Sequence, residues 1–261
     1  MPVRIPVGRR VFAPSWLMTG LTIALLTLFI VLGRWQWGRA EFKQQLLDDF
    51  VVRPAQAEYL GNRSMQELDR YARIQAQGRW DLERQFLLDN RTREGRAGFE
   101  VLTPFELEDG RWLLVNRGWL PFAGFRDQLP DLQAGFPELH RNQLVRITGQ
   151  VDELPRAGLA SGRLAPALSG PWPRLTTFPE TSDLAAAMGW SDPALLETRQ
   201  LLLDADSGYG YRRDWAPFAA GKGPEQNWSY AIQWWSFAVV LLILYVSLNL
   251  QRRETGDGEV K

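Results

Sequence analysis

Two long apolar segments lie near the two ends of the chain. Residues 11–33 and residues 226–251 contain no charged side chain, and their centres are mostly apolar. About 20 apolar residues in a helix cross the hydrocarbon core of a bilayer. Both segments are therefore predicted to be transmembrane helices. A cleaved signal peptide is the alternative for the first segment, but its apolar stretch is too long and no small-residue cleavage site follows it.

The first helix is expected to continue beyond the bilayer. Apolar residues recur at three- and four-residue spacing over residues 39–52, which is typical of an amphipathic helix. Arg53-Pro54 should end it, because the residue before a proline is disfavoured in the helical conformation.

Alternating apolar and polar residues between the two segments predict strands. The alternation is clearest over residues 71–80, and a tight hairpin is expected at Asp109-Gly110. Further strands are expected at residues 86–89, 99–107, 112–117, 144–151, 176–178 and 201–205. Short capped helices are expected at 64–71 and 182–189. The predicted fold is two transmembrane α-helices bracketing a mainly antiparallel β domain, barrel- or sandwich-like, with short helices.

This pattern divides the chain into five regions with a predicted orientation. They are a tail (1–10), a transmembrane helix (11–33), a β-rich domain (34–225), a second transmembrane helix (226–251) and a tail (252–261). Basic residues flank both spans on the tail side, at Arg4, Arg9, Arg10, Arg252 and Arg253. The positive-inside rule predicts that both termini are cytoplasmic. The N-terminus lacks the Ser-rich pattern of a mitochondrial transit peptide, so we expect a bacterial inner membrane and a periplasmic domain.

Composition excludes several kinds of chemistry. The chain has 30 Lys and Arg against 30 Asp and Glu, which argues against a nucleic-acid partner. It has no Cys, so disulfides, thiolate metal sites and a Cys nucleophile are excluded. Its single His, His140, lies in a predicted loop and is interpreted as a solvated side chain, and no Gly-x-Ser-x-Gly turn is present. We therefore expect a protein that is not an enzyme, with an enzyme of the outer membrane face as the alternative.

The second apolar segment carries an aromatic stripe at helical spacing. The stripe consists of Tyr230, Trp234, Phe237, Leu241 and Tyr245. It either packs against the first span and lipid or forms a docking face for a membrane protein or a flat hydrophobic cofactor. On the first span, Gly20 and Ala24 form a small-xxx-small pattern, which predicts a close helix contact.

Over nearly its whole length the chain resembles the Surfeit locus protein 1 family of cytochrome c oxidase assembly factors. The most specific motif is the heptapeptide from Val115 to Pro121. The others include Leu32–Trp37 with Arg39 and Lys43 after it, Gly78-Arg79-Trp80, and Tyr230–Trp234. The resemblance implies an assembly factor for a haem–copper terminal oxidase, with oxidase subunit I, haem A synthase and membrane lipid as partners. The alternative is a periplasmic binding module, anchored by two spans, for another envelope complex.

The resemblance also implies site residues. It assigns a partner-binding or structural role to Trp35, Gln36, Arg39, Lys43, Asn116, Arg117, Gly118, Trp119 and Pro121. It implies transient contact of haem A with Asn227, Tyr230 and Trp234. The family's proposed haem ligand is a His three residues before this Tyr, and here Asn227 replaces it. Because an Asn amide is a poor axial ligand for haem iron, strong haem binding is not expected.

Overall fold

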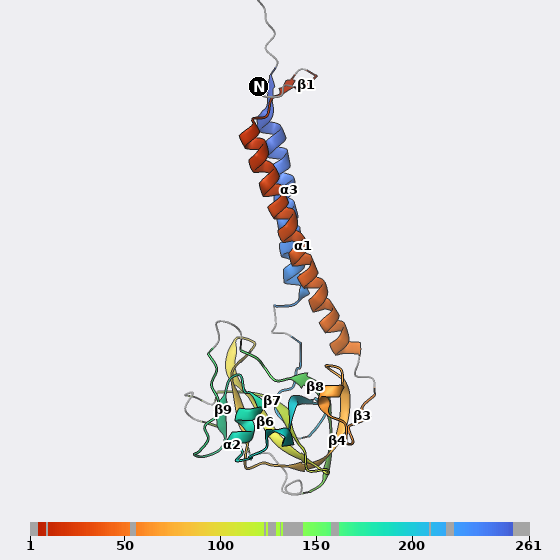
Figure 1. Cartoon of the computed structure of the whole chain (residues 1–261), viewed down its shortest axis with the longest axis vertical. Helices are drawn as coiled ribbons and strands as arrows, with labels where there is room; N and C mark the ends of the chain where they lie inside the picture. Colours follow the sequence, from red (N-terminus) through yellow and green to blue (C-terminus); the bar gives the residue numbers. More distant parts are fainter. Residues whose placement is uncertain are drawn as a thin grey trace, which may run out of the picture. The chain divides into compact units, whose positions relative to one another are not determined.

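The computed structural model describes residues 5–8, 10–52, 56–122, 124, 129–130, 132, 143–157, 162–208, 210–217 and 222–252. The chain divides into two compact units. One contains residues 1–46 and 221–261, and the other contains residues 47–220 (Figure 1). His140, Arg4, Arg9 and Arg253 lie outside the described residues.

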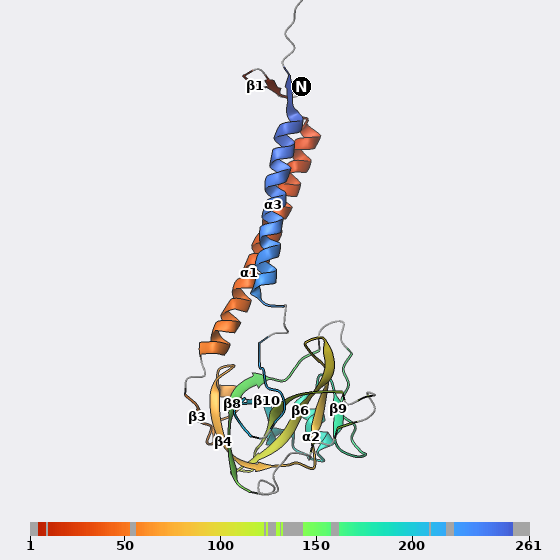
Figure 2. The ribbon, with the colours of Figure 1, turned by 180° about the vertical axis from the view of Figure 1, so that it is seen from behind.

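Two long helices dominate the first unit. They are α1 (Trp16–Val52) and α3 (Pro224–Asn249), and both are long and apolar enough to cross a membrane. By this length and composition the chain is a membrane protein. The predicted continuation of the first helix is confirmed, since α1 remains helical to Val52. The two helices run side by side in opposite directions, as Figures 1 and 2 show.

Most of the aromatic stripe packs between the two helices. Trp234 stacks on Phe29 with ring centroids 5.8 Å apart, and Phe237 lies 6.0 Å from the same ring. The Tyr245 hydroxyl lies 2.7 Å from Thr19 Oγ1 near the other end of the pair. Tyr230 and Phe237 are 44% and 43% exposed. The packing interpretation of the stripe holds for Trp234, Phe237 and Tyr245 through their contacts with α1.

Glycine makes room for the opposite helix at Gly33 rather than at the predicted position, Gly20. A Cβ added to Gly20 would meet no atom within 4 Å, so the expected small-residue contact at Gly20 is wrong. A Cβ on Gly33 would overlap the indole of Trp235. The side chain opposite, rather than the spacing of small residues along one helix, decides where a glycine is required.

A small three-stranded sheet lies where α1 begins and α3 ends. Its strands are β1 (Ile5–Val7), β2 (Arg10–Phe12) and β11 (Leu250–Arg252), in the order β1-β2-β11, and both pairings are antiparallel. Ala13 N donates to Asn249 O at 3.0 Å, which ties the start of α1 to the end of α3. The sequence pattern did not predict these strands.

The second unit is built on a sheet of eight strands among the described residues. Its hydrogen-bonded order is β3 (Glu58–Tyr59), β4 (Arg73–Trp80), β8 (Val145–Glu153), β10 (Leu196–Leu203), β7 (Trp112–Pro121), β6 (Arg96–Leu107), β5 (Phe86–Arg93) and β9 (Arg174–Thr176). Pairing of β4 with β6 closes the strands between them into a small barrel. The predicted strand-rich domain with few short helices is confirmed. Three of its pairings, β3–β4, β10–β7 and β5–β9, are nevertheless parallel.

Two clusters of buried apolar side chains lie on opposite faces of the strands in this domain. The barrel interior is filled by alternate residues of its strands, such as Ile74, Phe105 and Val115. Outside it, a second cluster joins Phe86 on β5 to Leu184 on α2 (Thr181–Ala187). Because β5 to β7 bury residues on both faces, their sequences contain long apolar runs as well as alternation.

Several local predictions need correction. The helix expected at 64–71 is only one 3₁₀ turn, η2 (Met65–Glu67), although the Ser64 side chain does cap it by accepting from Gln66 N at 3.2 Å. The helix expected at 182–189 begins one residue earlier, so Ser182 is not its cap. The tight hairpin is confirmed: Gly110 adopts φ 85° between β6 and β7, and its N–H donates to Leu107 O.

Candidate functional site

Three of the predicted site residues in the helical unit meet in one hydrogen-bonded cluster. Lys43 Nζ donates to Asn227 Oδ1 at 2.6 Å, and Asn227 Nδ2 donates to Gln36 Oε1 at 2.6 Å. Gln36 and Lys43 lie two helical turns apart on α1, so they share a face, and Asn227 lies in the first turn of α3. We name these three residues the helix-pair cluster.

Lys43 also binds the chain just before α3. Its Nζ donates to Lys222 O at 2.7 Å and lies 3.4 Å from Gly223 O. A hydrogen bond to a charged group contributes about 1.5–3 kcal/mol. The helix-pair cluster therefore fixes the first turn of α3 and the residues that precede it against α1.

Asn227 is buried, with 8% of its surface exposed. Both ends of its carboxamide are engaged, the oxygen with Lys43 and the nitrogen with Gln36. An amide with these partners offers no lone pair of the imidazole, thiolate, thioether or phenolate kind that binds haem iron. The residues present at this position do not fit an axial haem ligand.

Aromatic side chains surround the helix-pair cluster. Trp37 stacks on Trp235 with centroids 5.6 Å apart and lies 6.4 Å from Trp228. Trp35 is 55% exposed and carries the Arg39 guanidinium 5.3 Å from its ring centroid. Exposed Trp and Arg side chains at the end of a span are typical of the membrane–water interface.

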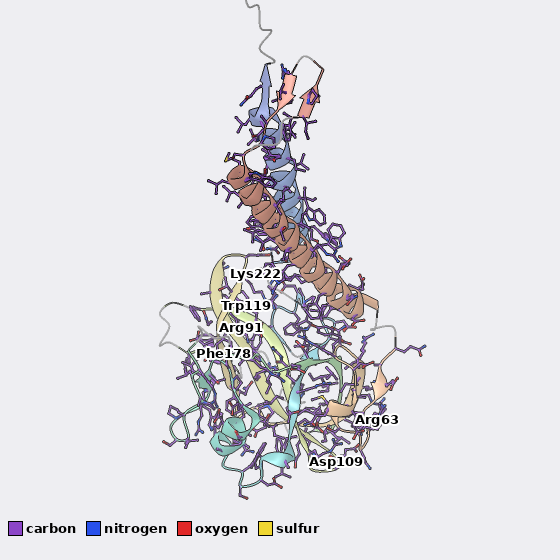
Figure 3. All side chains as sticks on the ribbon, turned by 45° about the horizontal axis from the view of Figure 1, so that its top comes forward. Arg63, Arg91, Asp109, Trp119, Phe178 and Lys222 are labelled. Atoms are coloured by element: carbon purple, nitrogen blue, oxygen red, sulfur yellow. The ribbon has the colours of Figure 1, made fainter. Side chains whose placement is uncertain are left out.

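The second motif, residues 115–121, forms most of β7 in the other unit. Asn116 is fully buried; its Nδ2 donates to Glu100 Oε2 at 3.0 Å and to Gln200 Oε1 at 3.2 Å. Trp119 Nε1 donates to Arg91 O at 3.1 Å, and Figure 3 shows these two residues close together. Their contacts tie β7 to β6, β10 and β5.

Arg117 is a buried cation at the centre of this motif. Its Nη1 donates to Gln85 Oε1 at 2.9 Å, and its guanidinium lies 5.1 Å from the Tyr211 ring centroid. Burial lowers the pKa of Arg117 to about 10, against the opposing attraction of Tyr211, so the side chain stays charged at neutral pH. Removing one of the polar partners of this buried charge would be strongly destabilising, because the charge would be left uncompensated.

Gly118 is required by a close approach of the chain rather than by a turn. The expected end of the strand at this residue is wrong, because β7 continues to Pro121. Gly118 adopts φ 115°, and an added Cβ would lie 2.7 Å from Arg212 O. Trp119 N donates to the same carbonyl at 2.8 Å. Pro121 pairs with Gly98 at the end of the strand.

An open groove of about 690 Å³ lies at the ends of β8 and β10. Some of its charged lining residues form ion pairs with one another: Arg156 with Glu153 at 2.9 Å and Arg163 with Glu180 at 3.2 Å. Phe178, labelled in Figure 3, is among its apolar lining residues. None of the motif residues lines this groove.

The structure thus separates the predicted site residues into two groups. Gln36, Lys43 and Asn227 converge in the helical unit, and the residues of β7 form a network in the strand-rich unit. Sequence reasoning missed Gly33 and Trp235, where the absence of a side chain on the glycine leaves room for the indole. It also missed Gln85, a buried polar residue at the edge of an apolar run, which is the available signal for an interior hydrogen bond.

Comparison with known proteins supports one family. A search of curated proteins finds no match to the chain. The family model described as the SURF1 family matches residues 23–239, which include both the helix-pair cluster and the β7 motif. That match covers most of the chain, so the protein belongs to the SURF1 family of cytochrome oxidase assembly factors.

Proposed function

We propose that this protein is a membrane-anchored assembly factor that assists the maturation of subunit I of a haem–copper terminal oxidase. The observation that carries the proposal is the family match over residues 23–239. The proposed home is a bacterial inner membrane, with both termini cytoplasmic and the β domain periplasmic. The flanking Arg residues support this orientation.

The proposed role is scaffolding without catalysis. Asn116 and Arg117 are buried in the β domain, where they shape the barrel. The helix-pair cluster holds α3 on α1 and leaves Trp35 and Tyr230 exposed. We assign these exposed aromatic residues to contacts with subunit I at the membrane–water interface, because Trp and Tyr side chains are enriched at protein interfaces.

Iron ligation by Asn227 is not part of the proposal. The amide is held by Lys43 and Gln36, and it does not fit haem iron. The apolar rings of the α3 stripe can support a flat hydrophobic molecule only through packing and stacking. Transfer of haem A to subunit I, with haem A synthase as its source, therefore requires an iron ligand outside this position.

Deletion of the chain tests the proposal. The deletion strain should lose active haem–copper oxidase and its haem absorbance while the oxidase structural genes remain expressed. Unchanged oxidase activity and haem content in that strain would overturn the assembly role. The natural chain and a His140→Ala variant should both restore activity, because we assign His140 to solvent.

Two neighbouring lysines provide a matched comparison in the same strain. Lys43→Met removes the donor that binds Asn227 and the residues before α3, so it should restore the oxidase only poorly. Lys222→Met should restore it fully, because Lys222 contributes its main-chain oxygen to this contact and its side chain is exposed. Equal restoration by both variants would show that the helix-pair cluster is not needed for assembly.

A further inference from the structure

A second row of side chains follows α3 on the surface that faces away from α1. On the α1 side of the helix, Ala231 and Ala238 are buried, with 0% and 7% of their surfaces exposed. The side chains of the second row are polar and exposed, and we name them the polar stripe: Gln226, Ser229, Gln233 and Ser236. No part of α1 covers them.

Gln233 and Ser236 lie at the level of the apolar part of α1. Between them along α3, Trp234 stacks on Phe29 and Trp235 fills the space left by Gly33. Both of these α1 residues belong to the segment 11–33, which has no charged side chain. The polar stripe therefore extends into the hydrocarbon, where no water is available to a polar side chain.

The carboxamide of Gln233 has no hydrogen-bond partner in the described part of the chain. Ser236 differs, because its Oγ donates to Ile232 O of the same helix at 2.8 Å. The undescribed residues that precede α3, 218–221, carry no polar side chain, and the two tails belong to the other ends of the helices. Because an unpaired amide in an apolar medium is costly, Gln233 calls for a partner group on another transmembrane helix.

The spacing of the polar stripe indicates how that helix packs. Its two glutamines are seven residues apart, and so are its two serines. Both series continue at Val240 and Ile243, which are 52% and 59% exposed. A seven-residue repeat is the pattern of two helices that cross at a shallow left-handed angle, and small serines allow their backbones to approach closely. The polar stripe thus has the pattern of a helix–helix contact.

A second copy of this chain meets these requirements. Two copies carry the same basic flanks, so they insert in the same direction and their α3 helices are parallel. In a parallel, two-fold symmetric pair of identical helices, each position of the repeat lies opposite itself. Gln233 then faces Gln233, and a carboxamide, which has both donors and an acceptor, is complementary to its own copy.

We propose that the chain forms a two-fold symmetric dimer in which the polar stripe of α3 packs against the polar stripe of a second copy. The Gln233 carboxamides pair across the axis, and Ser229 and Ser236 provide the close contact. Because α1 packs on the opposite surface of α3, dimerisation leaves the helix pair intact. The proposal rests on the two helices crossing a membrane and is independent of the oxidase role.

Cysteine cross-linking in native membranes tests the contact, since the natural chain has no Cys. Full-length Ser236→Cys chains with two different affinity tags are coexpressed and treated with a short bifunctional thiol reagent, which should join copies that carry different tags. Leu242→Cys is the matched control, because Leu242 is 45% exposed on the same helix. It lies about 120° around the helix from Ser236 and should give little product.

The strength of association is measured separately. Förster transfer between purified full-length chains labelled at position 258 is followed as the protein is diluted into mild detergent. Gln233→Leu should weaken association roughly tenfold, the size of effect expected when interhelical hydrogen bonds are lost. Gln233→Asn keeps an amide and should retain most of the association. Gln45→Leu removes an exposed glutamine of α1 beyond the charge-free segment and should leave association unchanged.

Absence of a cross-link at position 236, equal cross-linking at position 242, or a product that joins position 236 to a different protein would overturn the proposal. Unchanged association of Gln233→Leu would also overturn it. The deletion test of oxidase assembly reads a different property, so failure of either proposal leaves the other standing.

Discussion

Asn227 lies where a single substitution distinguishes helix packing from haem ligation. His in place of Asn227 would bring an imidazole beside the Lys43 ammonium, which favours the neutral, iron-binding form of the ring. We predict weak haem binding by the natural protein and tighter binding by Asn227→His. Titration of haem into protein in detergent, followed at the Soret band, measures both affinities.

Asn227→Gln is the control for this prediction, because it changes the side chain but keeps an amide. It should bind haem as weakly as the natural protein. Tight binding by the natural protein that the His substitution leaves unaffected would mean that another residue ligates the iron.

The buried hydroxyl of Tyr71 lowers the stability of the fold, and the substitution Tyr71→Phe should remove this effect. Its ring is buried and meets Phe50 edge-on at 5.1 Å, but its hydroxyl is buried with no hydrogen-bond partner among the described residues. A buried, unsatisfied hydroxyl costs about 1–3 kcal/mol. Tyr71→Phe should therefore raise the free energy of unfolding by about 1 kcal/mol, and thermal unfolding of the full chain in detergent measures it.

The difference in stability between the natural protein and Tyr71→Phe should depend on pH. Burial raises the pKa of Tyr71 from 10.0 to about 12, so folding favours the neutral phenol. The stability that this preference contributes is complete below pH 10 and is lost as the pH rises through about 12. The natural protein should lose stability in that range faster than Tyr71→Phe. Parallel pH profiles would contradict the assignment.

At the scale of elements, the two glycines of the first span predict different outcomes. Gly33→Leu forces a side chain into the indole of Trp235 and should destabilise the helix pair by about 1–3 kcal/mol. Gly20→Leu, in the same helix but facing open space, should change stability by no more than about 0.5 kcal/mol.

Cross-linking of cysteines introduced at Thr19 and Tyr245, with a bifunctional thiol reagent long enough to replace the tyrosine side chain that reaches Thr19, reports the pairing of the helices in each variant. Cross-linking should fall for Gly33→Leu alone. A similar fall for both variants would mean that general crowding in the span, and not the Trp235 contact, governs the pairing.

The strands show what periodicity can predict and what it leaves open. Alternation and the Asp109-Gly110 turn identify β4, β6 and β7 because one face of each strand fills the barrel. Alternation does not encode which strands become neighbours. The parallel pair β10–β7 joins segments separated by β8 and β9, so nothing local in either strand specifies it.

The same limit applies to the candidate site. Spacing along α1 places Gln36 and Lys43 on one face, but their partner Asn227 is 191 and 184 positions away. At Gly118, too, a distant part of the chain determines the local structure. Its φ of 115° and the nearby Arg212 carbonyl follow from a distant segment, so the predicted strand 112–117 ends one residue before it.

For the whole molecule, the orientation in the membrane is the property to establish first. Reporter fusions at Gly8, Gln128 and Gly258 should give cytoplasmic, periplasmic and cytoplasmic signals in that order. The physical reason is the clustering of Arg residues outside each span on the tail side. A periplasmic signal at either end, or a cytoplasmic signal at Gln128, would refute the predicted topology.

The 184 positions between Lys43 and Asn227 also impose a delay during synthesis. A ribosome that adds roughly 5–20 residues per second needs about 10–40 seconds to make them. Until then α1 enters the bilayer alone, with the surface around Gly33 open and Lys43 without its partners on α3. Nascent chains stalled before residue 224 should therefore cross-link from position 33 to other membrane components, and full-length chains should cross-link from there to α3.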